Sequence, residues 1–196
     1  MRLPALLMAG GEGERLESNE EKPLFLFHGR PMVDWVREAL LSSNKISYVY
    51  VAVSSNTRET EAHLRRNADP RMVIVETPGA GYVEDMSYAL KEANLYKALT
   101  TSSDMPLLTP ADIDYVIEEY KSRGGIGSMA VLVPIPLVNQ LGLTTNYPLG
   151  ENAATGINIV DLRDARMTNL VTRRVNLAAN INTRSDVEIA LRLHNI

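Results

Sequence analysis

The sequence predicts an α/β fold, a Rossmann-like and mostly parallel sheet with helices on both faces, in a single domain over residues 1–196. An apolar run over residues 3–8 is typical of a parallel strand that is covered on both faces. Strand-like and helix-like segments then alternate at least four times, which is the pattern of a parallel sheet wrapped by helices. The length suits one ordinary domain, and the sequence contains no internal repeat or interdomain linker.

The composition excludes several functional classes. Hydrophobic residues make up 45% and charged residues 22%, which is the balance of an ordinary globular protein. The net charge of −4, without a Lys/Arg cluster longer than a pair, argues against a nucleic-acid partner. The absence of cysteine excludes disulfides and thiolate metal sites and fits a cytoplasmic protein. The apolar N-terminus is too short to span a membrane and lacks the pattern of a signal peptide.

Periodicity and capping signals predict the helices. Apolar residues recur at helical spacing over residues 32–41, and residues 83–93 also favour a helix. Three further helices carry a start signal, a cap residue with an acidic residue or proline at the expected offset: Asn56 with Glu59, Thr109 with Pro110, and Ser185 with Glu188. These helices are expected to reach about residue 66 and to span residues 111–122 and 186–194.

Runs of β-branched and apolar residues predict the other strands. These runs cover residues 48–53, 72–75, 96–102, 128–133, 156–160 and 175–181. Residues 135–155 are rich in Pro, Asn, Thr and Gly and have no clear period, which predicts a long functional loop or short insertion.

A glycine-rich loop follows the first strand, where ligands bind in open α/β sheets. Gly10, Gly11 and Gly13 allow close approach of the backbone, with N–H groups directed at phosphate oxygens. Arg15 offers a planar fork for a phosphate and Lys22 a mobile point charge. The loop fits neither the dinucleotide fingerprint nor the P-loop, so the alternative to a phosphate site is a tight turn with surface charges.

The N-terminal residues resemble the signature of nucleotidyltransferases that make nucleoside-diphosphate derivatives. The matching residues run from Leu7 to Arg15, as Leu-Met-Ala-Gly-Gly-Glu-Gly-Glu-Arg, with Lys22-Pro23 shortly after. The resemblance implies that the loop backbone, from Ala9 through the three glycines, holds the base and the triphosphate. It also implies that Arg15 contacts the leaving pyrophosphate and that Lys22 contacts the α-phosphate.

Asp104 lies after the expected strand 96–102, and a lone aspartate in such a loop is commonly a turn or cap residue. Here Met105-Pro106-Leu107-Leu108 separates it from the cap at Thr109, which leaves Asp104 available to a ligand. The segment Ser102-Ser103-Asp104-Met105-Pro106 resembles the family's S-x-D-M-P pattern, which implies a Mg²⁺ ligand at Asp104. The resemblance also implies a second ligand at Asn182, although Asn182 could merely end a strand.

Two further segments lie on the same predicted edge of the sheet. Gly79 and Gly81 permit close approach of a ligand, and the resemblance implies that the connection ending at Asp85 reads the base or sugar. Asn56 follows the second strand on that edge. The alternative for both segments is a capped turn.

The order of motifs is similar to that of the archaeal GTP:adenosylcobinamide-phosphate guanylyltransferases. The discriminating parts are Gly-Ala-Gly-Tyr-Val-Glu-Asp, residues 79–85, and Thr-Gly-Ile-Asn, residues 155–158. Ala80 departs from the pattern, which places a lysine there and puts in doubt a phosphate contact from this position. The resemblance implies that GTP and adenosylcobinamide phosphate are the substrates, with Mg²⁺ as cofactor, in cobalamin biosynthesis by a monomer or homodimer.

Other functions remain open at this point. Molybdenum-cofactor guanylyltransferases share the size and the S-x-D-M-P type segment, and sugar-phosphate nucleotidyltransferases are usually longer. A nucleotide-binding regulatory protein on the same fold would be the alternative without catalysis, but such proteins often lose the aspartate or the lysine. Tyr82 and Tyr147 are candidates for stacking on a large acceptor, and the alternative is that they are ordinary exposed tyrosines in loops.

Overall fold

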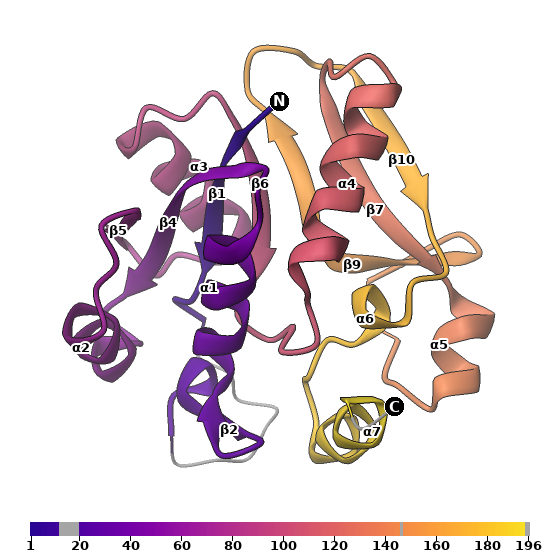
Figure 1. Ribbon diagram of the computed structural model, residues 1–196, viewed down its shortest axis with the longest axis horizontal. Coiled ribbons are helices and arrows are strands. Elements are labelled where there is room, and N and C mark those ends of the chain that lie inside the picture. The colour runs from indigo at the N-terminus through magenta and orange to yellow at the C-terminus, as the bar shows by residue number, and fades with distance from the viewer. Residues whose placement is uncertain (12–19, 146, 195–196) are drawn as a thin grey trace.

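The computed structural model describes residues 1–11, 20–145 and 147–194 (Figure 1). Its centre is an eight-stranded sheet in the order β10-β7-β9-β6-β1-β4-β5, with β8 paired to β9. The strands are β1 Leu3–Met8, β4 Ile46–Ser54, β5 Met72–Thr77, β6 Lys97–Ser102, β7 Ser128–Pro134, β8 Pro148–Leu149, β9 Asn152–Asp161 and β10 Met167–Val171. Strand β9 is antiparallel to β6, β7 and β8, and the other described pairs of this sheet are parallel, so the predicted mostly parallel α/β sheet is confirmed.

Strand β1 lies in the middle of the sheet because its residues are apolar on both faces. Leu3, Ala5 and Leu7 pack with helices α1, Met32–Ser42, and α4, Pro110–Ser122. Leu6 and Met8 pack on the opposite face with helix α3, Tyr82–Glu92. In Figure 1, α1 and α4 lie in front of the sheet and α3 lies behind it, so helices cover both faces as predicted.

A separate apolar cluster joins distant parts of the chain. It contains Phe27 and Met32 from the N-terminal part and Ile181, Ile189 and Ala190 from the C-terminal part. The cluster includes residues of strand β2 Leu26–Phe27 and of the helices α5 Ile135–Leu141, α6 Val175–Ala178 and α7 Arg184–His194. Strand β2 pairs with β3 Arg30–Pro31, and the 3₁₀ helix η2 Lys22–Leu24 directly precedes it. This cluster brings the segment after Lys22 to the segment that contains Asn182.

The structure corrects two of the expected elements in the second half of the chain. Residues 135–155 are not one long loop, because α5, β8 and the start of β9 lie within them. Helix α5 is short, begins with a proline in its first turn and ends at Gly142 with φ 77°. Residues 175–181 do not return to the sheet, since α6 occupies their first part, and β10 is the strand that joins β7. Only Leu170 of β10 is buried, so an exposed edge strand of this kind has little apolar pattern.

The capping predictions had different outcomes. Thr109 and Asp112 form a reciprocal capping box, with Pro110 in the first turn of α4, so the predicted start is confirmed. Helix α2, Arg58–Arg66, has Thr57 rather than Asn56 as its N-cap, so the capping box predicted there is wrong. At α7 the reciprocal bonds join Thr183 and Asp186 instead of Ser185 and Glu188.

Gly127 is needed where β7 begins, because its backbone has φ 73° and a Cβ there would overlap the carbonyl group of Arg166. We expect Gly127→Ala to lower the free energy of unfolding by about 2 kcal/mol or more, from left-handed strain and backbone displacement together. Urea unfolding measures this loss. Gly150→Ala is the matched control, since Gly150 has φ 62° but open space around its Cβ position. Equal losses in the two variants would show that the close approach to Arg166 is unimportant.

Candidate active site

The predicted site residues that the structure describes gather at the carboxyl ends of the parallel strands. The carboxyl end of β1 lies next to those of β4 and β6. The Ala9 amide donates to Ala52 O over 2.8 Å, and the Ser103 amide donates to Met8 O over 3.1 Å. The loops after β1, β4, β5 and β6 therefore open on one edge of the sheet, which is where α/β proteins bind ligands. Gly13 and Arg15 lie outside the described residues.

Lys22, Asp104 and Asn182 meet although they come from three distant parts of the chain. The Lys22 Nζ lies 2.6 Å from Asp104 Oδ2 and donates to Asn182 Oδ1 over 2.9 Å. The Lys22 and Asp104 side chains are each 15% exposed, so the ion pair is largely buried but open to the solvent on one side. The two residues predicted as metal ligands thus present oxygens to a single cation, the lysine ammonium.

Asp104 is held in place by its neighbours. Its Oδ1 accepts hydrogen bonds from Ser102 Oγ and, over 3.3 Å, from Asn180 Nδ2. Its own backbone carbonyl accepts from the Ile181 amide over 2.8 Å. The carboxylate is therefore oriented by hydrogen bonds before any ligand arrives, which is how preorganised sites are built.

Glu21 anchors the chain next to Lys22. Its carboxylate accepts from the backbone amides of Glu59 and Thr60, over 2.9 and 2.7 Å, and from Thr60 Oγ1 over 2.6 Å. These amides lie in the first turn of α2, so Glu21 supplies the cap that α2 does not take from its own N-cap residue. Glu21 was not among the predicted site residues, because the helix that it caps begins 37 residues later, at Arg58.

Asp186 anchors the backbone at Asn182, as Glu21 anchors the chain next to Lys22. It is fully buried, and Oδ2 accepts from the amides of Asn182 and Thr183 over 3.1 and 2.9 Å. Oδ1 accepts from the Thr144 amide over 2.9 Å. Burial alone would raise the pKa of Asp186, but the hydrogen bonds from Thr144, Asn182 and Thr183 bring it below its ordinary value.

Asp104 and Asn182 fit a hard divalent cation. A carboxylate and an amide oxygen are ligands that Mg²⁺ accepts, and both converge here on a positive charge. No group of three or more His, Cys, Asp or Glu side chains that could hold a metal occurs in the described part of the chain. A cation bound at Asp104 would therefore take its other ligands from phosphate oxygens and water, as Mg²⁺ commonly does.

A second group of predicted residues lies around the ends of β4 and β5. Ser54 Oγ donates to Gly10 O over 2.8 Å, and a Cβ on Gly10 would lie 3.3 Å from Ser54. A Cβ on Gly79 would lie 3.4 Å from the Asn56 amide nitrogen. Gly10, Asn56 and Gly79 thus surround Ser54, which the sequence reasoning did not single out as a site residue of its own.

The turn before α3 depends on Asp85. Asp85 is buried, and its Oδ1 accepts from the amides of Gly79 and Ala80 over 3.0 and 3.2 Å. Gly79 and Gly81 have φ values of 76° and 125°, which explains glycine at both positions. Gly11 is exposed, and a Cβ on it would meet nothing within 4 Å.

Gly156 leaves space for Ser102 and Asn180, the two side chains that hydrogen-bond to Asp104. A Cβ on this glycine would lie 2.6 Å from Asn180 Nδ2 and 2.7 Å from Met105 Sδ, and closer still to Ser102 Oγ. We expect Gly156→Ala to lower kcat about tenfold or more, because Ser102 and Asn180 must move and Asp104 loses its orientation. A pyrophosphate-release assay measures kcat. Unchanged kcat with a normal thermal transition would contradict this role.

No helix in residues 1–11, 20–145 and 147–194 is long and apolar enough to cross a membrane.

Known proteins that are similar to this chain are nucleotidyltransferases. Residues 5–135 match the MobA-like NTP transferase domain family. The chain is 28% identical to an adenosylcobinamide-phosphate guanylyltransferase from Methanocaldococcus jannaschii, covering 96% of this chain and 95% of the relative. It is 30% identical to a probable molybdenum cofactor guanylyltransferase from Pyrococcus horikoshii, over 62% of this chain and 58% of that protein.

Solved structures show the same fold. The 4-diphosphocytidyl-2C-methyl-D-erythritol synthase from Anaerococcus prevotii superposes with a TM-score of 0.72 and 10% identity, covering 100% of this chain and 96% of that one. The family match and the relatives confirm the prediction of a nucleotidyltransferase. The chain belongs to the MobA-like NTP transferase domain family.

Proposed function

We propose that this protein transfers GMP from GTP to adenosylcobinamide phosphate and releases pyrophosphate, in cobalamin biosynthesis. The observation that carries the proposal is the meeting of Lys22, Asp104 and Asn182 beside the loop that begins at Ala9 and Gly10. The choice of guanine and of this acceptor is supported by the relative from M. jannaschii, which is similar over nearly its whole length.

Asp104 and Asn182 are the proposed ligands of Mg²⁺. The ion, when bound, would neutralise negative charge on the phosphates. Lys22 lies beside these ligands and would contact the α-phosphate, and Arg15 would contact the departing pyrophosphate. The backbone of Ala9, Gly10, Gly11 and Gly13 would hold the triphosphate and base.

The nucleoside is proposed to lie on the other side of the loop, over the ends of β4 and β5. Gly10, Ser54, Asn56 and Gly79 are close to one another there. Asp85 keeps the turn at Gly79 and Gly81 in shape through its hydrogen bonds. The glycines leave room for a flat ring against the backbone.

The reaction needs no strong general base, because the acceptor phosphate is ionised at neutral pH. A phosphate oxygen of the acceptor attacks the α-phosphorus of GTP and forms a new P–O bond. The bond from the α-phosphorus to the bridging oxygen breaks, and pyrophosphate leaves with that electron pair. Catalysis then consists of in-line positioning and charge neutralisation, which are the tasks proposed for Lys22, Asp104 and Arg15.

A matrix of substrates tests the function. Each nucleoside triphosphate is paired with adenosylcobinamide phosphate, molybdopterin or a sugar phosphate, and Mg²⁺-dependent release of pyrophosphate is measured. We expect release with GTP and adenosylcobinamide phosphate. Release only with molybdopterin or a sugar phosphate would replace the acceptor, and GTP binding without release from any acceptor would indicate a nucleotide-binding regulatory protein.

A further inference from the structure

Two exposed tyrosines come from the two parts of the sheet that flank β6, the strand before Asp104. Tyr82 is the first residue of α3, which packs over β1, β4 and β5, and it is 46% exposed. Tyr147 precedes β8, which pairs with β9 on the other side of β6, and it is 74% exposed. Leu149 on β8 is a further large apolar side chain, 55% exposed.

The Tyr147 backbone is held by a hydrogen bond, although the side chain of this residue is exposed. Its carbonyl accepts from the Ala154 amide over 3.1 Å, and β8 pairs Pro148 with Ala153 directly after it. The Thr144 amide is bound to Asp186 on the near side of the segment. Tyr147 itself has φ 47°, a left-handed conformation that costs a residue other than glycine some energy.

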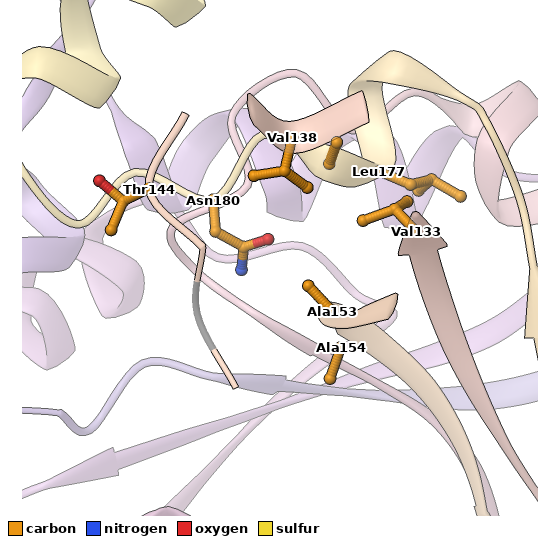
Figure 2. A pocket seen from close by; sticks show the side chains of 8 residues that line it. Val133, Val138, Thr144, Ala153, Ala154, Leu177 and Asn180 are labelled. Carbon is orange, nitrogen blue, oxygen red and sulfur yellow. The ribbon is translucent and has the colours of Figure 1, made fainter. Parts of the chain in front are cut away.

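The two tyrosines share their surroundings with Asp104. Partial desolvation raises the pKa of the Tyr82 hydroxyl, and the nearby Asp104 carboxylate and Tyr147 hydroxyl raise it further. Asp104 is also joined to the Tyr147 side of the site through Asn180, which donates to its Oδ1 and lines a hollow with Thr144, Ala153 and Ala154. Figure 2 shows the Asn180 side chain between Thr144 and these two alanines.

This hollow is too small for a large acceptor. Its volume of about 10 Å³ corresponds to roughly one water molecule, and the other labelled side chains that line it are apolar. A phosphate ester that reaches Asp104 must therefore leave the rest of its molecule on the open surface. Tyr82, Tyr147 and Leu149 are exposed apolar groups among the described residues, and tyrosine provides both a ring face and a hydrogen-bonding hydroxyl.

We propose that Tyr82, Tyr147 and Leu149 form the acceptor-binding surface and select phosphate monoesters that carry a large, partly apolar body. The phosphate points toward Asp104, and the body lies against the tyrosine rings. This inference rests on the proposed function, because it assigns the apolar contacts of the same acceptor. Small sugar phosphates would gain nothing from these side chains.

Binding and turnover of Tyr82→Ala and Tyr147→Ala test the surface. Equilibrium dialysis measures the Kd of adenosylcobinamide phosphate with Mg²⁺, and titration calorimetry measures the Kd of GTP. We expect each variant to weaken acceptor binding about three- to tenfold and to raise the acceptor KM equally, while GTP binding changes less than twofold. Tyr147→Phe should retain most of the affinity, since it keeps the ring.

Tyr48→Ala is the matched control, because Tyr48 is 49% exposed near the start of β4, at the opposite edge of the sheet. If the wild-type protein turns over the acceptor and both variants bind it as tightly as Tyr48→Ala does, the proposed acceptor-binding surface is contradicted and the proposed function is supported. If the wild-type protein releases no pyrophosphate but the variants weaken acceptor binding selectively, the function is wrong and the surface stands. A wild-type protein that does not bind the acceptor overturns both.

Discussion

Asp104→Asn is expected to lower kcat by about 10²–10³ while the protein remains folded. The substitution keeps the size of the side chain and removes its charge, the only carboxylate among the three residues that meet at this point. Mg²⁺ bound here would lose the one carboxylate among its proposed ligands, so the concentration of Mg²⁺ needed for half-maximal rate should also rise. Pyrophosphate release at varied MgCl₂ measures both effects, and circular dichroism with a thermal scan checks folding.

The control for Asp104→Asn should remove another paired aspartate. Asp164 pairs with Arg166 over 2.6 Å in the connection between β9 and β10, so Asp164→Asn is suitable. Its kcat and its Mg²⁺ dependence should stay close to those of the wild-type protein. If Asp104→Asn turned over at a rate similar to that of Asp164→Asn, the proposed role of Asp104 would be lost.

The central strands β1, β4 and β6 could be predicted from the sequence because they are largely buried. A run such as residues 3–8 has no polar position, and burial between two helical layers requires just that pattern. Two elements of the second half lack this signal. Strand β10 buries only Leu170. Helix α5 has seven residues, which is too few to establish a helical period in the sequence. Such elements are fixed by tertiary contacts and not by their own periodicity.

The candidate site shows the same division. Lys22, Asp104 and Asn182 could be named because they lie in recognisable motifs, but only the fold shows that one ammonium contacts both oxygens. Two capping patterns overlap before α7, Thr183 with Asp186 and Ser185 with Glu188, and the sequence could not choose between them. The structure favours the first, since Asp186 is fully buried and also binds the Thr144 amide.

Lys22→Met is expected to produce two effects of opposite sign. Turnover should fall by about 10²–10³, because the charge proposed to stabilise the α-phosphate is lost. Affinity of the nucleotide-free protein for Mg²⁺ should rise about tenfold or more, because the ammonium no longer competes for Asp104 and Asn182 and no longer repels the ion. Assays of pyrophosphate release and calorimetric titration with MgCl₂ measure the two effects separately.

Lys97→Met separates this competition from the general loss of a positive charge. Lys97 pairs with Asp161 over 2.9 Å, between the start of β6 and the end of β9, and therefore lies at the other edge of the sheet. Its removal should leave both turnover and Mg²⁺ affinity nearly unchanged. If Lys22→Met bound Mg²⁺ no more tightly than Lys97→Met, the lysine and the metal would not share these ligands. A lysine that only stabilised the fold would lower turnover without raising Mg²⁺ affinity, so the combination of the two changes identifies an ammonium that yields its oxygens to the ion and remains available to the phosphate.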